Sequence, residues 1–121
     1  MKSTDVFRQK YIYLNEITLH KATEESPELL VAILNDPVVD SSLVISLTII
    51  ALAVGGRVEY LPLIRSFLTH SAALVRESVY MGLFEYYEND PSLKLVLKEA
   101  LLMEPAEGVK KTISAILSQM Y

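Results

Sequence analysis

The sequence feature that most constrains the fold is an apolar stretch at residues 41–56, SSLVISLTIIALAVGG. Between Leu43 and Val54 it carries no charge, and only Ser46 and Thr48 interrupt the apolar run. As an α-helix it would span about 20 Å, which is shorter than the ~30 Å hydrocarbon core of a bilayer. It is therefore interpreted as a helix buried in protein rather than in a membrane, and the rest of the chain must supply neighbours on all its sides.

The composition indicates one domain over residues 1–121, long enough to bury a core without disulfide bonds. The chain has no Cys, which excludes a disulfide framework and a thiolate metal site and fits a reducing compartment such as the cytoplasm. Residues 1–11 contain no apolar run typical of secretion signals. The 15 acidic and 11 basic residues give a net charge of −4, which disfavours nucleic-acid binding and favours a basic partner.

Capping residues, prolines and apolar spacing predict seven helices and no strand, so the expected fold class is all-α. Pro27 and Pro62 each stand near the start of a helix, where a missing N–H is tolerated. Asp40 or Ser41 caps the apolar helix, and Gly55-Gly56 closes it because glycine tolerates the left-handed backbone of a helix end. The expected helices cover about 4–20, 27–34, 41–54, 62–68, 73–88, 93–103 and 109–120.

Six of these helices form three hairpins that repeat every 34 residues. The repeats are expected at about 24–57, 58–91 and 92–121, with the helix over 4–20 as an N-terminal cap. Polarity and turn chemistry agree at this one period, which is stronger evidence than any single helix assignment. The aligned rows are Leu34, Leu68 and Leu102 before the turns and Ile45, Val79 and Ile113 in the second helices.

Residues 61–87, LPLIRSFLTHSAALVRESVYMGLFEYY, resemble a HEAT repeat. The resemblance rests on a first helix that begins near Pro62, a short turn, and a second helix that opens with Val75-Arg76. The third repeat is similar, whereas the first has Ser41-Ser42 in place of Val-Arg. The residues that pack the second helix in this pattern are Val79, Gly82 and Leu83.

The HEAT resemblance implies a short right-handed α-solenoid of three hairpins plus the N-terminal capping helix. It also assigns Arg76 to bracing the hairpin turn through hydrogen bonds. The tetratricopeptide repeat has the same usual period, but its small and aromatic residues are not present in register here.

The apolar helix carries a second apolar stripe, which the stacking of hairpins leaves unexplained. The N-terminal helix is expected to cover this stripe with Phe7, Tyr11 and Leu14. A partner protein or a second copy of the chain is the alternative cover. The stripe consists of Leu43, Leu47, Ile50 and Val54.

The matching flank of the next second helix is the candidate protein-binding surface. Met81 and Phe84 are expected to form its apolar centre, and nearby carboxylates its acidic rim. The alternatives are ordinary core packing for the two apolar side chains and a solvated helix end for the carboxylates. The full set of candidate residues is Glu77, Met81, Phe84, Glu85, Glu88 and Asp90.

No residue pattern predicts an enzyme, a metal site or a cofactor site. His20 and His70 are the only histidines, and neither has the spacing of a metal ligand. Gly55-Gly56 follows a helix rather than a strand, unlike a phosphate-binding loop. The carboxylates of the candidate surface stand beside a polar loop, whereas acid–base catalysis requires a water-poor pocket.

The hypothesis that these features favour is a non-enzymatic binding module. Small HEAT-like proteins of this size resemble bacterial immunity proteins, which bind and block a toxin, and the net charge fits a basic toxin domain. One alternative is an accessory subunit of a larger enzyme, because HEAT-like proteins also resemble phycobilin lyase subunits. Another is a homodimer. The HEAT-like alkylpurine glycosylases need a basic DNA groove, which this acidic chain lacks.

Overall fold

Residues 27–120 are described in this computed structural model, and every regular element among them is helical. The all-α fold class predicted from the sequence is therefore confirmed for this part of the chain. The predicted helix over 4–20 lies outside the described residues. The elements are α3 (Pro27–Leu34), α4 (Ser42–Ala53), α5 (Leu61–Arg65), α6 (Ala73–Tyr86), α7 (Leu93–Met103) and α8 (Glu107–Ser118), with the 3-10 helices η1 (Val58–Tyr60) and η2 (Ser66–Thr69).

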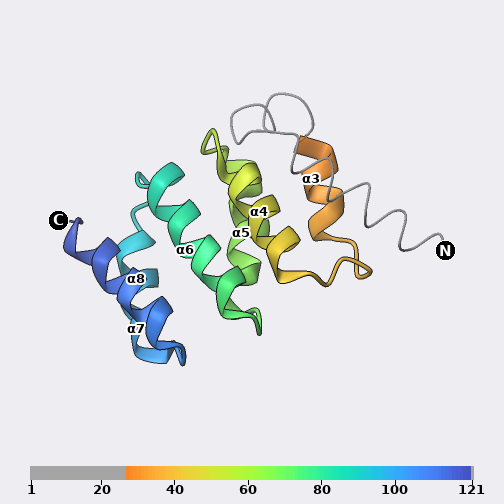
Figure 1. Ribbon diagram of the computed structural model, residues 1–121. Helices are drawn as coiled ribbons and strands as arrows, with labels where there is room; N and C mark the ends of the chain where they lie inside the picture. The colour runs from red at the N-terminus through yellow and green to blue at the C-terminus, as the bar shows by residue number, and fades with distance from the viewer. Residues whose placement is uncertain (1–26, 121) are drawn as a thin grey trace.

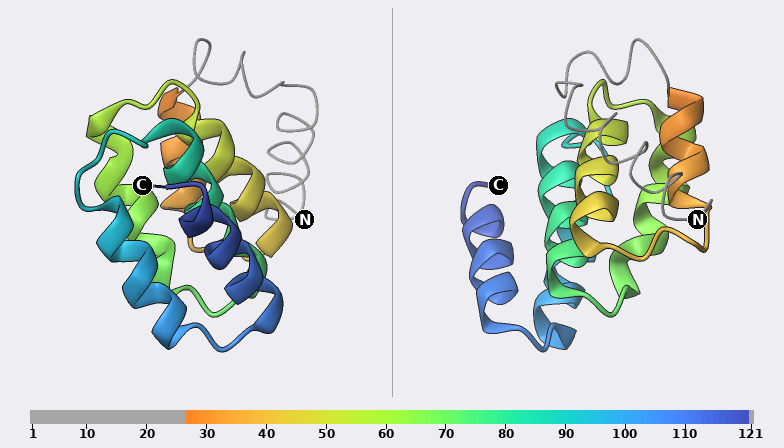
Figure 2. Two further views of the ribbon diagram at one scale, coloured as in Figure 1. Left: turned by 90° about the vertical axis from the view of Figure 1, so that its left-hand side faces the viewer. Right: turned by 45° about the vertical axis from the view of Figure 1, so that its right-hand side comes forward.

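The helices follow one another as three hairpins in two layers (Figure 1). Hairpin one consists of α3 and α4, hairpin two of α5 and α6 with the two 3-10 helices, and hairpin three of α7 and α8. The second helices α4, α6 and α8 lie side by side in one layer, and α3, α5 and α7 make the other (Figure 2). The most extensive packing joins α4 to α6. The three hairpin turns run along one edge of the molecule.

Helix α4 is buried on most of its sides, as the apolar stretch predicts, but the prediction of neighbours on every side is not met among the described residues, because Leu43 and Leu47 are exposed. Ser41 is its N-cap, and the Ser41 side chain accepts a hydrogen bond from the Val44 N–H at 3.4 Å. Gly55 and Gly56 follow the helix with φ values of +96° and +62°, which is the left-handed backbone expected of glycines that end a helix. A Cβ on Gly56 would collide with the carbonyl oxygen of Tyr86, so this position requires glycine for space as well as for backbone angle.

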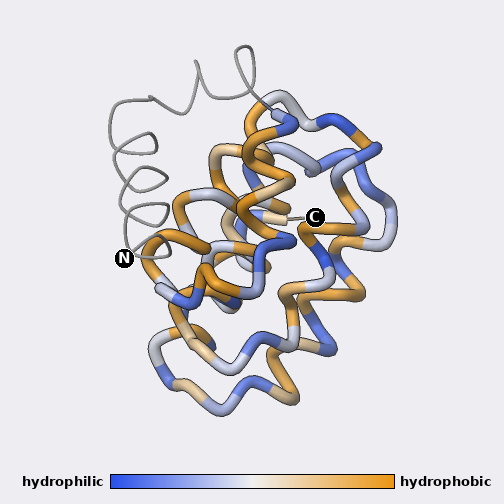
Figure 3. Tube along the Cα trace, turned by 90° about the vertical axis from the view of Figure 1, so that its right-hand side faces the viewer, coloured by the Kyte–Doolittle hydropathy of each residue, from blue (hydrophilic) through white to orange (hydrophobic). Residues whose placement is uncertain are grey.

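The core runs between the two layers and through all three hairpins. Ile45, Val79 and Ile113, one of the predicted 34-residue rows, are all buried. The row before the turns behaves differently, because Leu34 and Leu68 are partly buried and Leu102 is 85% exposed. The repeat of leucine at Leu34, Leu68 and Leu102 therefore does not correspond to equal burial in the three hairpins. Apolar and polar residues alternate along the helical trace, as expected for helices that bury one side (Figure 3).

Two predicted helix bounds differ from the structure. The helix expected over 62–68 is α-helical only to Arg65, and η2 continues it as a tighter 3-10 turn. The Ser66 hydroxyl donates to the Leu63 carbonyl, and this local bond competes with regular helix geometry. The helix expected to reach Glu88 ends at Tyr86.

Within the described residues, no helix is both long and apolar enough to cross a bilayer.

Candidate functional site

The three hairpin turns share one hydrogen-bond motif at a spacing of 34 residues. In each turn a side chain accepts a bond from the backbone N–H two residues later, and in hairpins two and three this N–H belongs to the N-cap residue of the second helix. The acceptors differ in chemistry, since one is a short carboxylate, one an imidazole nitrogen and one a longer carboxylate. The bonds are Val38 N–H to Asp36 Oδ1 at 2.9 Å, Ala72 N–H to His70 Nδ1 at 3.0 Å, and Ala106 N–H to Glu104 Oε2 at 2.9 Å.

Arg76 ties the second of these turns to the third. Its Nη1 donates to the carbonyl oxygens of His70 and Ser71, at 2.7 and 3.0 Å. Its Nε and Nη2 donate to the two carboxylate oxygens of Glu104, both at 2.8 Å. The bracing of the hairpin turn that the HEAT resemblance implies for Arg76 is thus present. The bidentate bond to Glu104 additionally links hairpin two to hairpin three.

Burial makes this ion pair unusual among the charged contacts of the described residues. The Glu104 side chain is 1% exposed and that of Arg76 is 11% exposed, whereas Lys110 and Glu107 form a pair with 37% and 80% exposure. The hydrogen bond from Arg76 holds the pKa of Glu104 below its ordinary value, against the opposing effect of burial. The same bond raises the pKa of Arg76.

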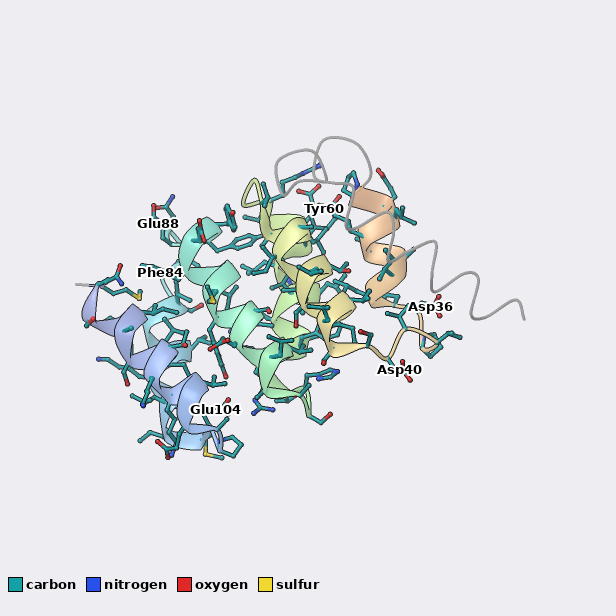
Figure 4. All side chains as sticks on the ribbon, viewed as in Figure 1. Asp36, Asp40, Tyr60, Phe84, Glu88 and Glu104 are labelled. Atoms are coloured by element: carbon teal, nitrogen blue, oxygen red, sulfur yellow. The ribbon has the colours of Figure 1, made fainter. Side chains whose placement is uncertain are left out.

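The predicted binding surface on α6 divides into exposed and internally bonded residues. Met81 is 46% exposed, and Glu85 and Glu88 are also exposed. Met81 and Glu85 are four residues apart and share one side of α6, and Glu88 lies in the turn just beyond the end of the helix. Phe84 is only partly exposed and packs against the core. Phe84 and Glu88 lie toward the end of α6 that is remote from Glu104 (Figure 4).

Two carboxylates of the predicted set make bonds within the chain. Glu77 Oε2 accepts from Thr112 Oγ1 at 2.7 Å, which joins α6 to α8. Asp90 Oδ1 accepts from the N–H and the hydroxyl of Ser92, at 3.0 and 2.8 Å, and these bonds lower the pKa of Asp90. Their contribution to an acidic rim is therefore smaller than that of the exposed pair Glu85 and Glu88.

The predicted second stripe of α4 is partly exposed and continues this surface. Leu43 and Leu47 are 46% and 36% exposed, while Val54 is buried. On α6, Leu74 is 45% exposed and stands seven residues before Met81, on the same side of the helix. The predicted cover by Phe7, Tyr11 and Leu14 lies outside the described residues. We call Leu43, Leu47, Leu74 and Met81, with Glu85 and Glu88, the outer face.

A cleft of about 490 Å³ opens between hairpins two and three, beside the Arg76–Glu104 pair. Tyr80 of α6 lines it, and burial together with the nearby Glu104 carboxylate raises the pKa of the Tyr80 hydroxyl. The sequence interpretation missed both Tyr80 and Glu104 as site residues. Glu104, His70 and Asp36 occupy equivalent positions of the 34-residue repeat, and this equivalence is the sequence signal that could have identified Glu104.

No group of three or more His, Asp or Glu side chains within residues 27–120 is arranged to hold a metal ion. His70 serves as a turn acceptor and stacks on Phe67 with ring centroids 6.1 Å apart. His20 lies outside the described residues.

The chain matches no protein-family model, no curated protein and no solved structure.

Proposed function

We propose that this chain is a non-enzymatic protein-binding module that uses its outer face to hold a basic partner protein. The observation that carries the proposal is the exposure of four large apolar side chains on neighbouring helices, next to two exposed carboxylates. An apolar centre with a charged rim is the usual anatomy of a protein interface. The charge of the rim and the net charge of −4 both favour a basic partner.

The fold proposed for this module is a short right-handed α-solenoid of three HEAT-like hairpins. The 34-residue recurrence of the turn bond supports this proposal, and so does the position of Arg76 at the start of a second helix. Such a stack presents helix faces as a continuous surface for a partner. By the resemblance to immunity proteins, we propose a basic toxin domain as the class of partner.

The experiment compares charge reversal on the rim with charge reversal elsewhere. The tagged full chain is used to isolate a stoichiometric partner from native lysate, and calorimetry then measures its affinity. Glu85→Lys with Glu88→Lys should weaken binding at least tenfold at low salt and less at high salt, because exposed charges are screened. The control, Glu28→Lys with Glu59→Lys, changes the net charge equally on exposed residues outside the outer face.

A second pair of variants separates the apolar centre from its rim. Met81→Asp should abolish binding at any salt concentration, since it places a charge in the apolar part of the interface. Equal binding by the rim variant and its control would refute the charge argument. Light scattering on the chain alone tests the homodimer, because a concentration-dependent doubling of mass that Met81→Asp removes would assign the outer face to self-association instead.

A further inference from the structure

The cleft beside the ion pair owes its existence to the short first helix of hairpin two. Helix α5 ends at Arg65 and continues as the 3-10 helix η2, and within the described residues α5 and α7 do not pack closely. The space between them has a volume of about 490 Å³, within the range of ~300–1,000 Å³ that small-molecule sites occupy. Helix α6 contributes Arg76 and Tyr80 to its lining.

Tyr80 brings to this cleft a hydroxyl that has no protein partner among the described residues. The residue is only 3% exposed, and its hydroxyl makes no hydrogen bond within the part of the chain that the structure describes. Among those residues Ser46 Oγ is the one side-chain polar atom that is both sealed from solvent and unpaired. The Tyr80 hydroxyl therefore keeps contact with solvent through the cleft. Buried tyrosine hydroxyls usually find a partner, so this group is placed to bond a bound molecule.

Hydrogen-bond donors predominate among the uncommitted polar groups of the cleft. The Glu104 carboxylate already accepts bonds from Arg76 and from the Ala106 N–H. His70 accepts from Ala72 at Nδ1, so the neutral ring carries its proton on Nε2. The Nε2–H of His70 and the Tyr80 hydroxyl are both hydrogen-bond donors, so a ligand that offers an oxygen acceptor would match them.

The charges that line the cleft cancel. Arg76 and Glu104 neutralise each other at 2.8 Å, and the lining also includes one further cation, Arg65, and one further anion, Glu99. Because Arg65 and Glu99 carry opposite charges, an ionic ligand would be attracted by one and repelled by the other while losing its hydration, whereas an uncharged ligand loses little. The remaining wall is largely apolar and consists of Leu68, Val96, Ala100, Met103 and Pro105.

We propose that this cleft binds a small, uncharged, mainly apolar organic molecule whose carbonyl or hydroxyl oxygen pairs with the Tyr80 hydroxyl. The apolar walls hold the body of the molecule, and the donors at the floor fix its orientation. This site is independent of the outer face. A partner protein and a cleft ligand can therefore be tested separately.

Three probes of similar size test the chemistry of the site by amide NMR titration of the full chain. Acetophenone carries a carbonyl, ethylbenzene lacks an acceptor, and benzoate carries a charge. Acetophenone should shift the amides of the lining residues Thr69, Ser71 and Ala100 in a saturable way. Ethylbenzene should bind about tenfold more weakly, as expected for the loss of one buried hydrogen bond, and benzoate should be weaker than acetophenone.

Matched variants test the role of the hydroxyl. Tyr80→Phe should weaken acetophenone binding about tenfold and leave ethylbenzene binding unchanged. Tyr87→Phe removes a hydroxyl that is bonded to the Arg57 carbonyl instead, and it should leave both affinities unchanged. Ala100→Met should fill the cleft and abolish binding of all three probes, which keeps the test valid if the tyrosine variants are unstable.

Several outcomes would overturn the proposal. These are an absence of saturable shifts in the lining amides, equal affinity of Tyr80→Phe and wild type for acetophenone, or tighter binding of benzoate than of acetophenone. The rim variant with Glu85→Lys and Glu88→Lys should bind acetophenone normally. This result distinguishes a failure of the cleft proposal from a failure of the protein-binding proposal.

Discussion

Replacing Glu104 by Gln tests whether the Arg76–Glu104 pair holds hairpin three to hairpin two. The change keeps the size of the side chain and removes the charge from a group that is 1% exposed. Breaking a buried ion pair on one side costs about 3–5 kcal/mol, because the other charge stays buried without its partner. Arg76 keeps its bonds to two carbonyl oxygens, and Gln still offers one oxygen acceptor. The expected loss of unfolding free energy at pH 7 is therefore about 2–3 kcal/mol.

Urea unfolding followed by far-ultraviolet circular dichroism measures this loss as a lower midpoint with an unchanged slope. The pH dependence supplies a second readout. The pKa of Glu104 is lower in the folded protein than in the unfolded chain, where a carboxyl group has its ordinary pKa of about 4.3. The carboxylate therefore contributes fully to the free energy of unfolding above that ordinary pKa, and the contribution is lost as the pH falls through the lowered pKa of the folded protein. The difference between wild type and Glu104→Gln should accordingly shrink as the pH falls below about 4.

Glu107→Gln is the matched control. It removes the same charge from the exposed pair with Lys110, whose atoms are 3.2 Å apart, and should change the free energy of unfolding by less than about 0.5 kcal/mol. If Glu104→Gln and Glu107→Gln unfold at the same urea concentration at pH 7, the pair does not stabilise the junction. A difference that persists unchanged into acid would also contradict the reasoning.

Two further substitutions, Gly56→Ala and Ser46→Ala, probe the packing around α4, and Gly108→Ala in α8 serves as a control. Gly56→Ala should destabilise the protein by more than about 1 kcal/mol, because φ is +62° and the new Cβ meets backbone. Gly108→Ala, inside α8 with no atom near its Cβ, should instead add about 0.5–1 kcal/mol in the same urea assay. Ser46→Ala should raise the thermal midpoint and add about 1 kcal/mol, since it deletes a buried hydroxyl that has no partner in the described residues. An unchanged or lower midpoint would mean that this hydroxyl is satisfied in solution.

The sequence predicts those parts of the fold that depend on local chemistry. The helix predicted over 27–34 and the Ser41 cap of α4 are confirmed, and Gly55 and Gly56 adopt the left-handed backbone expected of them. Each of these depends on residues within one turn of the helix end. The burial of Ile45, Val79 and Ile113 could also be predicted, because the periodic spacing of apolar residues indicates which side of a helix is covered.

Features that depend on tertiary contact escaped prediction. Glu104 lies 28 residues from Arg76 in sequence, and nothing local to either residue reveals the pair. The exposure of Leu102 follows from the absence of a described neighbour, which an apolar pattern cannot register. The cleft is lined in part by residues at the change from α-helix to 3-10 helix at Ser66, and a single competing hydroxyl accompanies that change. The right-handed solenoid, the binding surface and the partner stay predictions.

The junction between hairpins two and three adds a buried ion pair to apolar packing, and this has a consequence for how the molecule unfolds. Gly82 lets α6 approach α4 closely, since a Cβ placed there would stand 3.3 Å from that of Ala53, and this junction is apolar. Cooling weakens apolar association, whereas acid neutralises the carboxylate of Glu104. Cold should therefore weaken both junctions, whereas acid should selectively weaken the one that holds hairpin three. Acid would then yield a partly folded species that keeps hairpins one and two packed and releases hairpin three.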